Sequence, residues 1–168
     1  MNYSILATSQ SKNDATIHVK ESVIDFGTTS KTTNTLPNPA ELFLSSFAAC
    51  MLKNVERFSM MMKFDYQKTS LEVSAVRLEN PSRMNYIEYS LTIYSDDDAI
   101  NKSLLKKNIE KYGTIYNTIK QSCTITGSIK ITATSKRVND SILFDKTNLI
   151  NIGKIAFTEP IYPLHFRQ

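Results

Sequence analysis

The sequence predicts an α+β domain built from an antiparallel β-sheet and one long central helix. Residues 37–59, PNPAELFLSSFAACMLKNVERFS, are the most apolar long stretch of the chain, and apolar residues recur there at helical spacing. Stretches before and after it alternate apolar and polar residues, as half-buried strands do. The chain has 168 residues, of which 41% are hydrophobic, and this suits one domain with a short extension.

The N-terminal stretch predicts a β-hairpin or meander. Residues 2–10 and 15–27 alternate apolar and polar side chains, and the SKND between them is a turn signal. Residues 27–39, GTTSKTTNTLPNP, are polar and without a pattern. We expect them to form a loop that leads into the central helix.

The central helix is expected from Pro39 to about Met62. Asn38 is a favourable N-cap, Pro39 suits the first helical position, and Glu41 lies in the first turn, where the helix dipole favours a carboxylate. The first half of this helix is apolar nearly all round, so it must be buried on more than one side. One small domain can hardly cover it alone, and we therefore expect a homodimer.

Two strands and a second helix are expected next. Residues 70–79 and 85–95 alternate around the turn signal NPSR. Residues 95–113 have aspartates at their start and lysines toward their end, which complements a helix dipole, and Gly113 is the expected stop.

The end of the domain is expected near residue 135. A short helix over residues 114–121 and a last strand over residues 124–135 complete it. Residues 136–168 show little periodicity, and we expect a C-terminal extension that packs on the domain 1–135 or on the partner subunit.

Charge and targeting signals exclude several classes of protein. The net charge of +4 is a mild excess of scattered lysines, so nucleic-acid binding, for example as an RNA-associated module, is not favoured. The longest apolar run, LFLSSFAACML, is too short for a bilayer, which needs about 20 residues. We expect a cytoplasmic protein without membrane contact, whose Cys50 and Cys123 are reduced thiols.

Two motifs resemble those of the OsmC/Ohr family, whose names stand for osmotically inducible protein C and organic hydroperoxide resistance. PNPAELFLSSFAAC is similar to the family motif that opens a long central helix with a proline, an acidic residue and leucine, followed by Ala-Ala-Cys. KYGTIYNTIKQ is similar to the second motif, in which Cys-Pro-Val begins a short helix. The resemblance covers about residues 1–135. It implies an intertwined homodimer and a thiol-dependent reductase of organic hydroperoxides, an antioxidant enzyme of the stress response.

The resemblance assigns the peroxidatic cysteine to Cys50, and the chain departs from the family elsewhere. Gly113 occupies the position of the second, resolving cysteine. Ala40 stands where the peroxidase branch tends to have glutamate, and Glu41 follows it. That branch also uses an arginine from an N-terminal hairpin, whereas only Lys12 lies near the expected turn here. The pattern is closer to the broad OsmC-like branch.

The candidate catalytic residues are Cys50, Glu41 and Lys12, and each has a simpler structural explanation. Cys50 could be a buried, inert thiol, because free cysteine is among the most buried residue types. A reactive Cys50 needs nearby positive charge or hydrogen-bond donors, which Lys53 or Asn54 one turn on could supply. Glu41 lies about 13 Å from Cys50 along the helix and on its opposite side, so a partner subunit must supply it to a shared site.

The remaining candidates have weaker support. Cys123 is expected to pack, with a substitute resolving role as the alternative. His18 and His165 are single and distant from other ligand residues, so no metal site is expected, nor any cofactor.

Two interpretations of function remain open. In the first, the chain reduces a small hydrophobic peroxide at Cys50 and is restored by an external thiol reductant. In the second, it is a non-catalytic OsmC-like dimer that binds a small apolar ligand.

Overall fold

The computed structural model describes residues 2–134 of the chain. The expected C-terminal extension, residues 136–168, lies outside the described residues and stays a prediction. No helix among residues 2–134 is both long and apolar enough to span a lipid bilayer.

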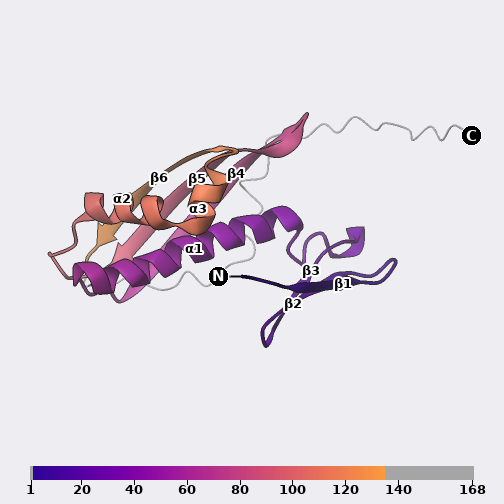
Figure 1. The fold of residues 1–168 in the computed structure, drawn as a ribbon, viewed down its shortest axis with the longest axis horizontal. Coiled ribbons are helices and arrows are strands. Elements are labelled where there is room, and N and C mark those ends of the chain that lie inside the picture. Colours follow the sequence, from indigo (N-terminus) through magenta and orange to yellow (C-terminus); the bar gives the residue numbers. More distant parts are fainter. Residues whose placement is uncertain (1, 135–168) are drawn as a thin grey trace, which may run out of the picture. The chain divides into compact units, whose positions relative to one another are not determined.

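The N-terminal residues form a three-stranded antiparallel meander, as predicted. Its strands are β1 (Leu6–Ser9), β2 (Ala15–Val19) and β3 (Ser22–Phe26), and β2 lies between the other two (Figure 1). Lys12 and Lys20, in the two turns, adopt left-handed backbone conformations with φ of 65° and 55°. Both turns are short enough to fix the strand register.

The loop after β3 is folded around one aspartate. Asp14 accepts hydrogen bonds from the hydroxyl of Thr32 at 2.7 Å and from the backbone N–H of Thr28 and Thr29 at 3.0 and 3.1 Å. These bonds, led by that from Thr32, lower the pKa of the Asp14 carboxyl. The short 3-10 helix η1 (Ser30–Thr32) lies within this loop, which the sequence pattern predicted to be irregular.

Helix α1 (Pro39–Met62) has the predicted bounds. Asn38 accepts hydrogen bonds from the N–H groups of Ala40 and Glu41, and Glu41 accepts one from the N–H of Asn38 in return. This capping box begins the helix, and Lys63 in the left-handed conformation ends it.

The second sheet is mixed rather than wholly antiparallel. Its order is β4 (Lys68–Glu79), β5 (Ser82–Tyr94) and β6 (Thr124–Thr132). β4 and β5 are antiparallel, as predicted, but β6 runs parallel to β5. The strands are parallel because of the connection between them. Helices α2 (Lys102–Tyr112) and α3 (Thr114–Ile119) form a crossover that returns the chain to the end of the sheet where β5 begins, so β6 runs in the same direction as β5. The α+β class is confirmed, and this strand pair corrects the antiparallel expectation.

Helix α2 begins later than the sequence pattern predicted. Its N-cap is Asn101, and the preceding aspartates form a loop. Asp96 accepts the N–H of Thr134 at 2.7 Å, and Asp97 accepts the N–H of Asp65 at 2.9 Å. These long-range bonds compete with helix formation, so the aspartates connect strand ends instead of capping α2.

The three helices cover one face of the β4–β5–β6 sheet (Figure 1). Helix α1 contacts β4, α2 and α3, and α2 contacts β6. Burial of each large apolar side chain contributes roughly 1.5–3 kcal/mol. The largest fully buried side chains are those of Tyr89, Phe47, Phe58, Met51, Ile87, Leu91, Ile93, Leu105, Ile109 and Val55.

Candidate functional site

Cys50 lies in the middle of α1, at the edge of its buried face. Phe47, one turn before it, and Met51, the next residue, are fully buried. Ala49, the residue before it, is exposed. Cys50 itself is a free, half-buried thiol. The position therefore combines a fixed side chain with access from solvent, which a reactive cysteine requires.

The amide of Asn54 is directed at this thiol. Its Nδ2 donates to the Cys50 carbonyl oxygen at 2.9 Å and lies 3.7 Å from Cys50 Sγ. An amide nitrogen has two N–H donors, so it can serve both atoms. Asn54 is 7% exposed, which holds the amide in a place with little competing water. The two contacts hold the amide in a fixed position beside the thiol.

Gly113 lies beside the same amide. A Cβ atom built at Gly113 would be 3.5 Å from Asn54 Nδ2. The fold thus brings the position that the resemblance assigns to a resolving cysteine next to the group that contacts Cys50. The spacing of these residues in the sequence did not indicate that they would be close. Only the resemblance to the family motif did.

A side chain at Gly113 would be crowded by its neighbours. The same Cβ would lie 2.9 Å from the Ile109 carbonyl oxygen and 3.0 Å from Tyr116 Cβ. The carbonyl belongs to the last turn of α2, where it accepts the Gly113 N–H at 3.0 Å. Because this neighbour is backbone, it cannot move aside without disturbing the end of the helix.

We expect Gly113→Cys to destabilise the protein by about 1–3 kcal/mol, the usual cost of overpacking. Urea unfolding of this variant beside Thr114→Cys measures the effect, since Thr114 is exposed at the next position. An unchanged stability, together with a disulfide between Cys50 and the introduced cysteine, would show that the site still accepts a resolving thiol.

Three buried aromatic rings pack together in the core below α1. The ring of Phe47, one turn before Cys50, lies 6.0 Å from that of Tyr116 and 6.1 Å from that of Tyr89. Burial and the nearby Glu110 raise the pKa of Tyr116 to about 12, so its hydroxyl keeps its proton. No local sequence pattern distinguishes these tyrosines from other core aromatics, so their packing against Phe47 was not predicted.

A hydrogen-bonded network supports the cluster from α2. Tyr89 donates its hydroxyl to Glu110 Oε1 at 2.8 Å, and Lys106 Nζ contacts the same oxygen at 2.5 Å. Burial, followed by the hydrogen bond to Glu110, raises the pKa of Tyr89. The network fixes the tyrosine ring against Phe47.

Glu41 has a structural partner at the start of α1. Its Oε2 accepts the Asn38 N–H at 2.7 Å, which completes the capping box, and the residue is exposed. The helix places it about 13 Å from Cys50 along the axis and on the opposite side. Within one chain the two residues do not form a shared site, and the catalytic role of Glu41 stays a prediction.

The two candidate cations lie on different elements. Lys12 is exposed in the β1–β2 turn, and no hydrogen bond or ion pair within residues 2–134 joins it to Cys50. Lys53 is exposed on α1 one turn after Cys50. Side chains on a helix lean toward its N-terminus, so Lys53 leans toward the turn that contains Cys50.

Cys123 packs in the core after α3. It is 8% exposed and belongs to the main apolar cluster. Burial raises the pKa of its thiol, and the nearby Arg83 opposes this shift. Both features favour the predicted packing role.

Among residues 2–134, no group of three histidine, cysteine, aspartate or glutamate side chains is arranged to hold a metal ion.

These features define a small α+β protein with a half-buried thiol on a long helix, beside a buried amide. The sequence profile of the family described as OsmC-like protein matches residues 32–128. The chain therefore belongs to the OsmC-like family, as the two motifs indicated.

Solved structures share the fold at low sequence identity. An OsmC-like protein from Mycoplasma pneumoniae is 19% identical with a TM-score of 0.67, and the match covers 79% of this chain and 97% of that one. For an organic hydroperoxide resistance protein OsmC from Legionella pneumophila, the identity is 14%, the TM-score 0.56, and the coverage 76% and 97%. The organic hydroperoxide resistance protein OhrB of Bacillus subtilis is 17% identical with a TM-score of 0.55. That match covers 76% of this chain and 98% of that one. No curated protein matches the chain.

Proposed function

We propose that this chain reduces organic hydroperoxides with Cys50 as its peroxidatic thiol. The observation that supports this most directly is the Asn54 amide directed at a half-buried cysteine, with its nitrogen 3.7 Å from Cys50 Sγ. The names of the Legionella and Bacillus structures, both organic hydroperoxide resistance proteins, point to the same class of substrate.

The proposed reaction uses two equivalents of an external thiol. The Cys50 thiolate attacks one peroxide oxygen, the O–O bond breaks, and the leaving alkoxide takes a proton to become an alcohol. Cys50 is then a sulfenic acid. A first external thiol condenses with it to a mixed disulfide and releases water, and a second thiol displaces Cys50 and leaves as the external disulfide. The peroxide is reduced to alcohol and water, and the two thiols are oxidised.

The external reductant is required because of Gly113. Glycine stands at the position beside Asn54 where a resolving cysteine would lie, and the packing against Ile109 disfavours a side chain there. Cys123, buried in the core, is a poor substitute. The test is mass spectrometry of Cys50 after one equivalent of cumene hydroperoxide, with dimedone present to trap the sulfenic acid. A dimedone adduct on Cys50 is expected; an unmodified Cys50 would favour the non-catalytic alternative.

We further propose that the active form is a homodimer. Apolar side chains of the β1–β2–β3 sheet are exposed, Leu6 at 63% and Val23 at 57% among them. Leu52 and Met60 are exposed on α1 in the same way. A partner subunit would cover such surfaces and would also bring its Glu41 and Lys12 within reach of Cys50. Light scattering at micromolar concentration should give twice the mass of the monomer, and a stable monomer at that concentration would contradict this proposal.

A further inference from the structure

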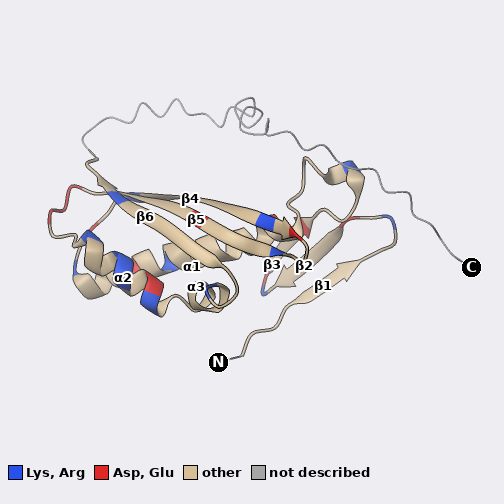
Figure 2. Ribbon diagram, turned by 90° about the horizontal axis from the view of Figure 1, so that it is seen from above, with Lys and Arg blue, Asp and Glu red and all other residues tan. Residues whose placement is uncertain are grey.

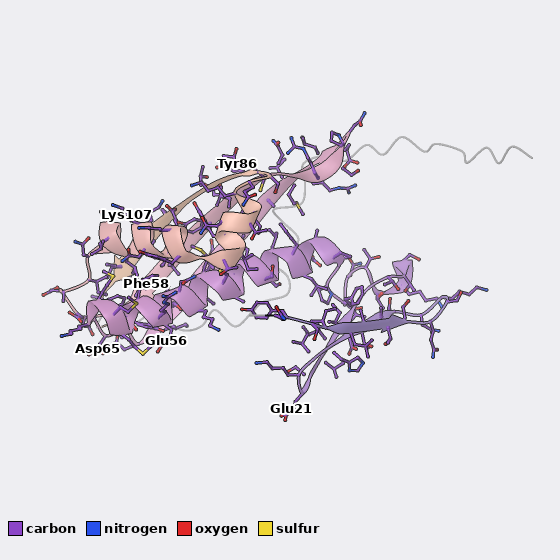
Figure 3. The ribbon with its side chains drawn as sticks, in the orientation of Figure 1. Glu21, Glu56, Phe58, Asp65, Tyr86 and Lys107 are labelled. Atoms are coloured by element: carbon purple, nitrogen blue, oxygen red, sulfur yellow. The ribbon has the colours of Figure 1, made fainter. Side chains whose placement is uncertain are left out.

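Helices α1 and α2 enclose an open pocket that the thiol site does not use. Figure 3 labels Phe58 on α1 and Lys107 on the adjacent α2, and the two helices are in contact. The α1 residues of the pocket lie about 10–18 Å beyond Cys50 along the helix axis. The pocket has a volume of about 350 Å³ and is lined by Arg57, Phe58, Met61, Met62, Asn108 and Tyr112.

The floor and one wall of this pocket are apolar. Phe58 is 2% exposed and its ring lies 5.8 Å from that of Tyr112. Met61 and Tyr112 are open to solvent, and Met62 Sδ accepts a hydrogen bond from Asn108 Nδ2 at 3.7 Å. Thioethers and aromatic rings adapt to apolar ligands of different shapes.

The cation Arg57 lines this pocket, and a second cation, Lys111, lies near the ring of the lining residue Tyr112. The Arg57 guanidinium is 5.5 Å from the centre of the Phe58 ring and 5.9 Å from that of Tyr112. The Lys111 ammonium is 5.1 Å from the Tyr112 ring. Among the described residues, no carboxylate lies within ion-pair distance of either cation. In Figure 2 the ribbon of α2 carries basic positions in blue, with acidic colouring in red among them.

A purely structural role explains only part of this arrangement. Lys111 lies in the last turn of α2, where a cation complements the helix dipole. The last turn of α1 contains no basic residue, so the dipole does not account for Arg57. Its contact with the two rings uses the face of the guanidinium, so the N–H groups at its edge can pair with an anion.

We propose that this pocket binds a small organic carboxylate with a short alkyl or aryl body. The carboxylate pairs with Arg57, whose planar fork of N–H donors matches its two oxygens, and Lys111 adds charge. The apolar body lies against Met61, Met62 and Phe58. Binding requires neither a reactive Cys50 nor a partner subunit, so the site stands apart from the proposed peroxide chemistry.

Calorimetric titration of the full chain with octanoate, beside 1-octanol, tests this site. The two probes share an eight-carbon chain and differ in charge. We expect saturable binding of octanoate and at least about tenfold weaker binding of octanol, which corresponds to about 1.4 kcal/mol. Arg57→Gln should weaken octanoate about tenfold and Arg57→Lys less, because lysine keeps the charge and loses the fork.

Matched variants separate the pocket from general charge effects. Arg77→Gln removes an exposed arginine on β4 and should leave octanoate affinity unchanged. Cys50→Ser should also bind octanoate normally, so failure of the peroxide proposal would not affect this result. Absence of octanoate binding, equal affinity for octanol, or an Arg57→Gln variant that binds as the wild type does would each overturn the proposal.

Discussion

Replacing Cys50 by serine is expected to slow hydroperoxide consumption by about 10³-fold or more, equivalent to about 4.1 kcal/mol of activation free energy. A serine hydroxyl is not deprotonated at neutral pH and does not cycle through an oxidised sulfur state. The Asn54 amide would still donate to the carbonyl of residue 50, so the helix should keep its structure. The measurement is the rate of cumene hydroperoxide loss with dithiothreitol as the external thiol, beside the thermal midpoint of unfolding.

Cys123→Ser is the matched control for this experiment. Cys123 is buried, and burial raises the pKa of its thiol, so it should contribute little to peroxide reduction. We expect its variant to keep the wild-type rate per folded molecule. Equal rates in wild type and Cys50→Ser would contradict the peroxidase proposal and favour the non-catalytic, ligand-binding alternative.

Gly127→Ala is expected to destabilise the protein by about 1–3 kcal/mol or more. Gly127 lies opposite Tyr89 in the β5–β6 register, and a Cβ there would be 2.2 Å from Tyr89 Cδ1. Strand propensity alone would favour alanine over glycine by roughly 0.5–1 kcal/mol, so the steric clash decides the sign. The ring has little freedom to move, because it is buried and its hydroxyl is bonded to Glu110.

Urea unfolding of Gly127→Ala and Ser128→Ala measures this cost. Ser128 is the exposed neighbour on the opposite face of β6, where an alanine meets no ring. Combining Gly127→Ala with Tyr89→Leu should cost less than the sum of the two single changes, because the smaller side chain removes the clash. Additive costs would show that the ring does not limit the residue at position 127.

The central helix illustrates what local sequence determines. Asn38, Pro39 and Glu41 lie within four positions of one another, and they begin α1 by contacts that need no other part of the chain. The alternating strands β4 and β5 and the stop at Gly113 were predicted for the same reason. Signals of this kind act over one turn of helix or one hairpin, so the sequence pattern contains them.

The aspartates before α2 show where local signals mislead. Asp96 and Asp97 match the pattern of a helix start, yet they bond to Thr134 and Asp65, which are far away along the chain. The parallel direction of β6 was missed for a similar reason, because strand pairing depends on how α2 and α3 cross the sheet. Neither result follows from the residues of the segment itself.

The candidate site divides in the same way. The sequence by itself determined that a cysteine lies mid-helix at position 50, with Asn54 one turn later on the same face. Only the tertiary structure decided that Asn54 is buried, that Gly113 lies against its amide, and that the Ile109 carbonyl crowds any side chain at position 113. Helical spacing follows from covalent geometry, whereas the approach of α1 to the α2–α3 junction results from packing between residues about sixty positions apart.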